Sequence, residues 1–177
     1  MPAATAMWPS TATPRPAARR RYWAKQVLLL GAGGAARGAL LPLLAARPAE
    51  LVIANRDVMK ALKLASAMSD HGRVVGCGYG DLGGETFDVV INATSASLSG
   101  EVPAVPASVL RKARLAYELV YGKGLTPFLS MASTAGAAQV ADGVGMLVEQ
   151  AADAFAWWRG VLPETGAVVD RLTVPLV

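Results

Sequence analysis

The stretch VLLLGAGGAARG, residues 27–38, decides the fold of this chain. Its first four residues are branched and apolar, which predicts a strand buried on both faces, as in a parallel sheet. Gly31 then permits a tight turn, Gly33 lets the backbone approach a pyrophosphate, and Ala36 lets a following helix pack closely on the strand. Because a strand precedes this pattern and an apolar helical run follows it, a dinucleotide site is favoured over a structural turn.

Further short apolar segments extend this strand–helix alternation along the chain. Strands are expected at residues 50–54, 73–76, 87–91, 115–117 and 138–140. Helices are expected at residues 58–68, from Thr126-Pro127 onward, and from about residue 144 to 158 or 159. Alternating strands and helices are typical of βαβ units. The sequence therefore predicts an α/β fold with a doubly wound, Rossmann-like parallel sheet in three layers, followed by C-terminal helices.

The net charge of +4 is located in the N-terminal segment. Arginines 15, 19, 20 and 21 and Lys25 lie in the first 25 residues, which contain no acid, and without them 12 basic residues face 13 acidic ones. We expect residues 1–24 to be a disordered basic Pro/Ala-rich tail and residues 25–177 to be a single domain. Neither a nucleic-acid surface nor a membrane span is expected.

Cysteine and histidine are each present once, as Cys77 and His71. A single cysteine excludes an intrachain disulfide and a thiolate metal cluster, and it favours a reducing, cytoplasmic location. No neighbouring residue in the sequence would orient His71 as a base. We therefore predict no metal site, an inert thiol at Cys77 and a solvated loop position for His71.

Three residues after the second expected strand bear on the choice of cofactor. Asn55-Arg56-Asp57 falls where this architecture places the adenosine ribose, and Arg56 offers a planar cation suited to the 2′-phosphate of NADP. Lys60, one turn on, adds a second positive charge. Asp57 would repel a phosphate, but it would also cap the next helix. Two cations against one anion favour NADP over NAD.

Two further polar features remain open between a functional and a structural interpretation. Residues 92–95, Asn-Ala-Thr-Ser, follow a predicted strand at the edge where open α/β sheets bind ligands, yet their hydroxyls would also cap a turn. In the last long helix, an apolar face is predicted from Met146, Leu147, Ala151, Ala154 and Trp158. Gln150 falls within this stripe and faces either a polar cleft or water at the stripe edge.

Taken together, the motifs resemble the cofactor-binding half of shikimate dehydrogenase. The matching pieces, in the order and spacing of that family, are GAGGAARG at 31–38, Asn55-Arg56, NATS at 92–95, YGKGLTPFL at 121–129 and DGVGMLVEQAA at 142–152. The resemblance runs from about residue 25 to the C-terminus. It implies an enzyme that reversibly reduces 3-dehydroshikimate to shikimate with NADPH, in the pathway to aromatic amino acids.

The resemblance also assigns roles to residues of this chain. It implies cofactor-binding roles for Gly31, Ala32, Gly33, Gly34, Ala35, Asn55, Arg56, Asp57, Lys60, Thr94, Leu119 and Gly143. It implies substrate contacts for Tyr121 and Gln150. The family usually has Thr where Asp57 stands, and often has Asp-Met-Phe where residues 118–120 read Glu-Leu-Val.

The catalytic Lys and Asp of the family belong to an N-terminal substrate domain, and residues 1–24 contain neither residue type. We therefore predict no catalytic residue in this chain and poor turnover by the chain alone. The alternatives are a non-catalytic NADP-binding module and a truncated fragment. Apolar surface left exposed where such a domain docks would favour homo-oligomers.

Overall fold

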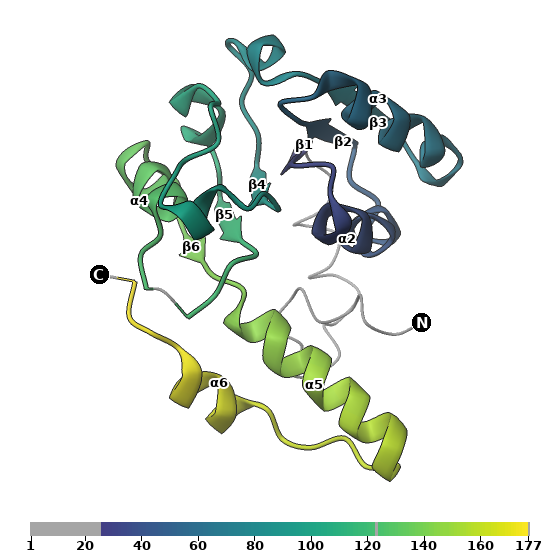
Figure 1. Cartoon of the computed structure of the whole chain (residues 1–177), viewed down its shortest axis with the longest axis vertical. Helices are drawn as coiled ribbons and strands as arrows, with labels where there is room; N and C mark the ends of the chain where they lie inside the picture. The colour runs from purple at the N-terminus through teal and green to yellow at the C-terminus, as the bar shows by residue number, and fades with distance from the viewer. Residues whose placement is uncertain (1–25, 123, 177) are drawn as a thin grey trace.

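The computed structural model describes residues 26–122 and 124–176, which form an α/β fold (Figure 1). The strands are β1 Gln26–Leu30, β2 Glu50–Ala54, β3 Val74–Cys77, β4 Val89–Asn92, β5 Leu115–Glu118 and β6 Val140–Ala141. The α-helices are α2 Gly34–Ala45, α3 Val58–Ala67, α4 Pro127–Thr134, α5 Val144–Arg159 and α6 Gly166–Leu172. Short 3₁₀ helices occupy Ser69–His71, Tyr79–Leu82, Ala96–Ser99 and Ala107–Leu110.

The described strands pair in parallel in one sheet of order β3-β2-β1-β4-β5-β6. β1 is central because its apolar residues are buried on both faces of the sheet, with Leu28, Leu29 and Leu30 fully covered. The chain crosses over between β3 and β4, so the strand order reverses beside β1. This reversal is the topological switch point of a doubly wound sheet. The predicted Rossmann-like fold is confirmed.

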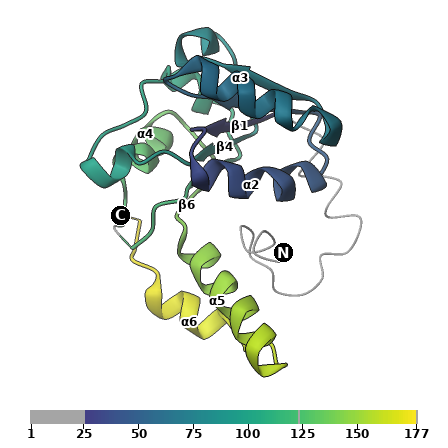
Figure 2. The ribbon, with the colours of Figure 1, turned by 45° about the vertical axis from the view of Figure 1, so that its right-hand side comes forward.

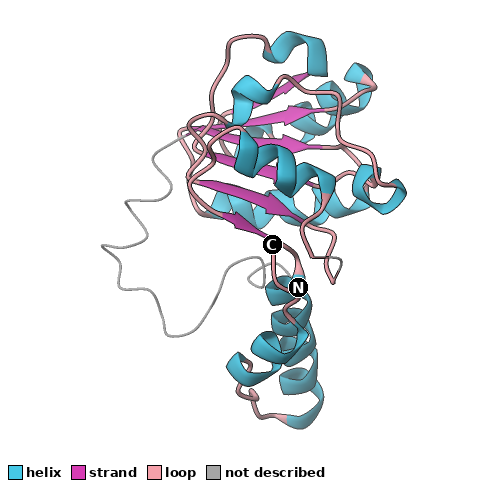
Figure 3. Ribbon diagram, turned by 90° about the vertical axis from the view of Figure 1, so that its left-hand side faces the viewer, coloured by secondary structure: helices cyan, strands magenta, loops and turns pink. Residues whose placement is uncertain are grey.

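Separate cores cover the two faces of the sheet. On one face Leu29 packs with buried residues of α2 and α3, such as Leu40 and Leu64. On the other face Leu28 packs with Phe128 of α4 and with the loop residues that precede β5. Helices therefore lie on both sides of the strands, as Figure 3 shows, which confirms the expected three layers.

The C-terminal helices α5 and α6 extend away from this layered body (Figures 2 and 3). Only the Val144, Val148 and Ala152 face of α5 is fully buried. The predicted apolar face is therefore wrong in its orientation, because Ala151 is exposed and Trp158 is 76% exposed. The physical reason is that α5 leaves the sheet and packs on α6, so much of its apolar surface has no core to face.

Several boundaries also differ slightly from the prediction. The last strand lies at Val140–Ala141 rather than at residues 138–140, because β6 pairs with β5 only from Ala116↔Val140 onward. The third strand is shifted by one residue, to Val74–Cys77. The disordered tail expected at residues 1–24 lies outside the described residues. Within the described part of the chain, no helix is long and apolar enough to span a membrane.

Candidate functional site

The carboxyl ends of four neighbouring strands lie in register at one edge of the sheet. Leu30 of β1 pairs with Ala54 of β2 and with Asn92 of β4. Asn92 in turn pairs with Glu118 of β5. Most of the predicted site residues follow these strand ends within a few positions. The fold therefore brings them to the edge where open α/β sheets bind ligands, around the switch point between β1 and β4.

Gly31 shapes the loop that follows β1. Its φ of +108° lies in a region that side chains rarely adopt, and a Cβ there would lie 2.9 Å from the carbonyl oxygen of Ala93 and 3.3 Å from Cγ2 of Thr94. The Gly31 N–H donates to the oxygen of Ala54, and the Ala93 N–H donates to that of Leu30, both at 2.8 Å. The first loop thus rests against the loop after β4.

The start of α2 is open to a ligand. Gly33 is the N-cap residue and has no side chain to occupy the free backbone N–H groups, and the first turn of α2 carries no acid. Gly33, Gly34 and Ala35 are exposed, and a Cβ on either glycine would meet nothing within 4 Å. Ala36 is fully buried against the sheet, as predicted. This arrangement offers N–H donors and a positive helix end to an anion.

The carboxylate of Asp57 is engaged with protein groups at the start of α3. It accepts a hydrogen bond from the Met59 N–H at 3.1 Å, so the predicted capping role is confirmed. Its other oxygen lies 3.6 Å from Nζ of Lys60. The Asn55 side chain donates to the Asp57 carbonyl at 3.0 Å, which fixes the turn after β2. Arg56 is exposed within this turn.

Tyr79 is a neighbour of this turn that the sequence did not indicate. It follows β3 and is half-buried. Burial raises the pKa of the Tyr79 hydroxyl, and the positive charge of Arg56 opposes the rise. The turn after β2 is joined to the end of β3, because the Asn55 N–H donates to the Cys77 carbonyl at 3.2 Å.

A buried carboxylate, Glu118, lies where β4 and β5 end. Its Oε2 accepts hydrogen bonds from Nδ2 of Asn92 at 3.0 Å, Oγ of Ser97 at 2.6 Å and Oγ1 of Thr126 at 3.3 Å. Its Oε1 accepts from the Val120 N–H at 3.4 Å. Burial raises the pKa of Glu118, and these four donors oppose the rise. This cluster was missed at the sequence level, although a lone acid that ends an apolar strand is a usable signal.

The loop after β5 rests on the residues that precede α5. A Cβ on Gly143 would collide with the carbonyl oxygen of Leu119 and lie 3.4 Å from Cδ1 of Tyr121, so only glycine fits there. Asp142 accepts a hydrogen bond from the Gly122 N–H at 3.3 Å. Leu119, Tyr121 and Gly143 are therefore brought together, and the ring of Tyr121 is partly open to solvent.

Gln150 lies farther along α5 and is exposed. The buried face of α5 is formed by Val144, Val148 and Ala152, so Gln150 lies outside it. Its exposure agrees with contact to a cleft or to water.

His71 and Cys77 are the single histidine and the single cysteine of the chain. His71 is exposed in a 3₁₀ helix, and burial followed by the charge of Asp81 raises the pKa of the Cys77 thiol, which disfavours a reactive thiolate. In the described part of the chain, no group of three or more metal-ligating side chains comes together.

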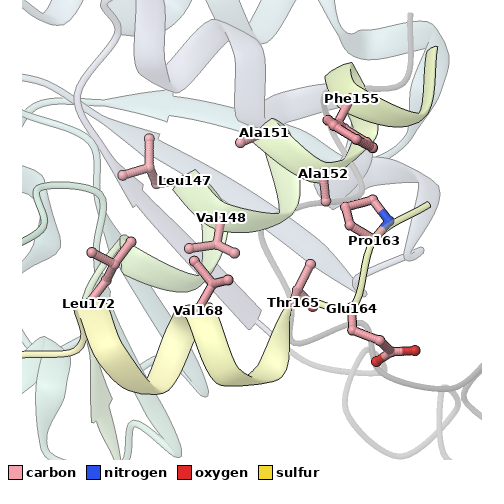
Figure 4. A pocket seen from close by; sticks show the side chains of 10 residues that line it. All are labelled: Leu147, Val148, Ala151, Ala152, Phe155, Pro163, Glu164, Thr165, Val168 and Leu172. Carbon is pink, nitrogen blue, oxygen red and sulfur yellow. The ribbon is translucent and has the colours of Figure 1, made fainter. Parts of the chain in front are cut away.

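An apolar groove lies apart from the strand ends, between α5 and α6 (Figure 4). Its lining residues are Leu147, Val148, Ala151, Ala152, Phe155, Pro163, Glu164, Thr165, Val168 and Leu172. A hydrogen bond of 2.7 Å from the Thr165 hydroxyl to Glu149 ties the two helices together. Glu164 and Thr165 are the two polar residues in this lining, which offers no cation to an anionic ligand.

Two family models match the chain. One describes shikimate/quinate 5-dehydrogenase and matches residues 17–100, and the other describes the C-terminal domain of shikimate 5′-dehydrogenase and matches residues 143–173. Together they cover both the phosphate loop and the start of α5. The chain belongs to the shikimate dehydrogenase family.

Similar proteins agree with this assignment. The chain is 56% identical over 161 residues to a shikimate dehydrogenase (NADP(+)) of Aromatoleum aromaticum, an alignment that covers 89% of this chain and 56% of the relative. It is 62% identical to the Ael1 enzyme of Pseudomonas putida, with a TM-score of 0.84, over 88% of this chain and 57% of that one. Shikimate 5-dehydrogenase of Thermus thermophilus, solved with NADP(H) and shikimate, is 29% identical with a TM-score of 0.70, over 84% and 54% of the two chains.

This chain aligns with only part of each relative, which limits the properties of the relatives that can be stated for it. It spans just over half the length of the curated relatives it matches. The activity and the ligands of the whole proteins are therefore proposals for this chain, to be argued from its own residues.

Proposed function

We propose that this chain supplies the cofactor-binding half of an NADP-dependent shikimate dehydrogenase, which reversibly reduces 3-dehydroshikimate to shikimate. The proposal rests on two neighbouring groups. One is the open N-terminus of α2, which follows β1, and the other is Arg56, the exposed cation in the turn after the adjacent strand β2. A pyrophosphate and a ribose 2′-phosphate need these two groups side by side. The NADP named for relatives of this chain supports the same choice.

The pyrophosphate of NADP would bind at residues 31–35. The empty space around Gly33 and Gly34 fits such a group, because a Cβ on either residue would occupy it. Backbone N–H groups at the start of α2 would donate to the phosphate oxygens, and the helix dipole adds to the attraction. Thr94 would line the same side, since it lies against Gly31.

The 2′-phosphate would bind between Asn55, Arg56 and Lys60. Arg56 is exposed, so its guanidinium is accessible for a bidentate contact with phosphate. Asp57 weakens this clamp less than its charge implies, because its carboxylate is held by the Met59 N–H and lies near Lys60. On this basis we propose NADP rather than NAD as the cofactor.

The nicotinamide would lie beside Leu119 and Gly143, at the far end of the same edge. The ring of Tyr121 and the amide of Gln150 would contact the substrate from the cofactor side. Tyr121 is close to Gly143, since a Cβ there would lie 3.4 Å from its Cδ1. When bound, NADPH supplies the hydride for the carbonyl carbon of 3-dehydroshikimate.

Reduction of the carbonyl also needs a group that moves a proton to its oxygen. We assign no catalytic residue within the described part of the chain. Glu118 is buried among Asn92, Ser97 and Thr126, so its carboxyl is not accessible to a substrate. The resemblance implies that the proton-transfer group belongs to an N-terminal substrate domain, so we propose that it is not supplied by residues 26–122 and 124–176. A second candidate function is an NADP-binding module without turnover.

The first experiment is shikimate-dependent formation of NADPH by the purified chain, with NAD in parallel and NADPH binding measured on the same sample. Binding with turnover supports the dehydrogenase. Binding without turnover supports the non-catalytic module and overturns catalysis by this chain alone. A folded sample that binds neither cofactor would overturn both proposals.

We also propose that copies of this chain associate through the exposed apolar surface at the end of α5. Trp157 is 84% exposed, and Trp158, Val161 and Leu162 beside it are similarly open. Such a patch favours association. Sedimentation of Trp157→Ser/Trp158→Ser should show a smaller species than the parent chain, whereas Leu41→Ser, on exposed α2 surface, should not change it. Equal sedimentation of all three proteins would refute this surface.

A further inference from the structure

The carboxylate of Glu118 is fully buried, yet the proposed chemistry gives it no contact with cofactor or substrate. Removing a carboxylate from water is costly unless hydrogen bonds replace the lost solvation. The four hydrogen-bond donors to Glu118 described above are uncharged, and three of them meet at the single oxygen Oε2. Packing alone therefore does not account for a carboxylate at this position.

The donors belong to separate segments that surround the nicotinamide end of the proposed site. Asn92 ends β4, Ser97 lies in the 3₁₀ helix that follows, and Thr126 is the N-cap of α4. Val120 belongs to the loop after β5, which is the loop that packs against residue 143. One carboxylate therefore ties together the loop after β4, the loop after β5 and the start of α4.

The same cluster continues toward the phosphate loop. The Asn92 side chain donates to Glu118, and its Oδ1 accepts from the N–H of Thr94 at 3.1 Å and from its hydroxyl at 2.7 Å. Thr94 lies against Gly31, at the turn into the phosphate loop. The Leu119 N–H donates to the Asn92 carbonyl at 3.0 Å, on the other side. Asn92 thus stands between the two parts of the edge, and Glu118 holds its amide.

We propose that Glu118 is a positioning residue, which fixes the wall of the nicotinamide subsite relative to the phosphate loop through Asn92 and Val120. This inference rests on the proposed function, because it requires a nicotinamide at Leu119 and Gly143. Glu118 itself touches neither ligand. Its effect is to hold the loops at one spacing, so that both ends of one dinucleotide are bound at once.

A carboxylate is suited to this role because both of its oxygens accept. In Glu118→Gln one oxygen becomes an NH₂ donor, which would face either the Val120 N–H or the three donors at Oε2. At least one donor would then lose its partner, and the loop that carries it would shift. Glu118→Asp keeps both acceptors with a shorter reach, so it tests whether the chemistry or the volume matters.

The experiment compares two probes on the same chain. NADPH spans both ends of the site, whereas 2′-phospho-ADP reaches only the phosphate loop and the Arg56 clamp. For Glu118→Gln we expect the Kd of NADPH to rise about tenfold or more, and that of 2′-phospho-ADP to stay within about twofold. Glu118→Asp should recover part of the NADPH affinity. Ser97→Ala, which removes one donor, should shift the ratio of the two Kd values in the same direction by less.

The ratio of the two affinities distinguishes positioning from general destabilisation. Equal weakening of both probes, or no change in either, would overturn the positioning role while leaving the proposed function intact. If Glu118→Gln does not fold, Glu118→Asp and Ser97→Ala decide the question by the same ratio. A folded parent chain that binds neither probe would instead overturn the proposed function, and the inference with it.

Discussion

The two sides of the ligand-binding edge are built in opposite ways. On the β1–β2 side, the groups offered to a ligand are backbone N–H groups and exposed side chains such as Arg56. On the β4–β5 side, the polar groups are buried and bonded to one another around Glu118. The first side can therefore lose a contact without unfolding, whereas the second is part of the folded core. Changes on the two sides should separate affinity from stability.

Within the phosphate loop, Gly31 and Gly33 should differ most clearly in their effects on stability and on affinity. Gly31→Ala forces a side chain into a positive φ and against the Ala93 carbonyl, which should lower the free energy of unfolding by about 2–4 kcal/mol. Gly33→Ala, two residues on, meets no atom within 4 Å, and should change it by less than about 1 kcal/mol. Urea unfolding of both variants measures the difference.

NADPH binding completes the test of these two glycines. The new methyl group of Gly33→Ala would occupy the space proposed for the pyrophosphate, so its Kd for NADPH should rise about tenfold while its stability is kept. Comparable stability losses in both variants would show that the open space at Gly33 is a feature of folding rather than of binding.

Arg56→Ala probes the exposed side of the edge alone. A charge-assisted contact to phosphate contributes about 1.5–3 kcal/mol, so the Kd for NADP should rise about tenfold or more and that for NAD much less. Stability should stay nearly constant, because Arg56 is exposed. Calorimetric titration with each cofactor measures both constants, and Lys63→Ala, on the exposed surface of α3, serves as the matched loss of one cation. Equal weakening of NADP and NAD would refute the clamp.

The buried side should respond to pH. Burial raises the pKa of Glu118 in the folded chain above its ordinary value of 4.5. Between the ordinary and the raised pKa, the folded chain therefore binds more protons than the unfolded chain. The contribution of Glu118 to stability therefore falls as pH rises through this window and is constant above it. In Glu118→Gln this part of the decrease in the free energy of unfolding should be absent, which urea unfolding from about pH 4 upward measures.

The control for this pH dependence is Glu101→Gln, which removes an exposed carboxyl instead. Its unfolding free energy should follow the parent chain across the same pH range. If Glu118→Gln also follows the parent chain, the carboxyl is not desolvated as its burial implies.

The contrast between the two sides also explains what the sequence could predict. The β1–α2 unit, the exact bounds of β2 and the Asp57 cap depend on neighbours a few residues apart, so local patterns were sufficient. The three side chains that donate to Glu118 lie 8 to 26 residues away from it in the sequence and meet it only in the folded chain. The buried face of α5 depended on α6 and on where the helix leaves the sheet, which helical periodicity does not encode.

The smallest effect is expected at Gln150, which belongs to neither side. Its side chain is exposed on α5, so Gln150→Ala should change the free energy of unfolding by less than about 0.5 kcal/mol and leave the Kd for NADPH nearly unchanged. A role in substrate binding would appear only as weaker binding of shikimate to the NADP-bound chain, measured by calorimetry. The neighbouring Ala151→Ser, also on exposed α5 surface, controls for the helix itself. A loss of several kcal/mol in Gln150→Ala would mean that α5 packs through this residue as well as through Val144, Val148 and Ala152.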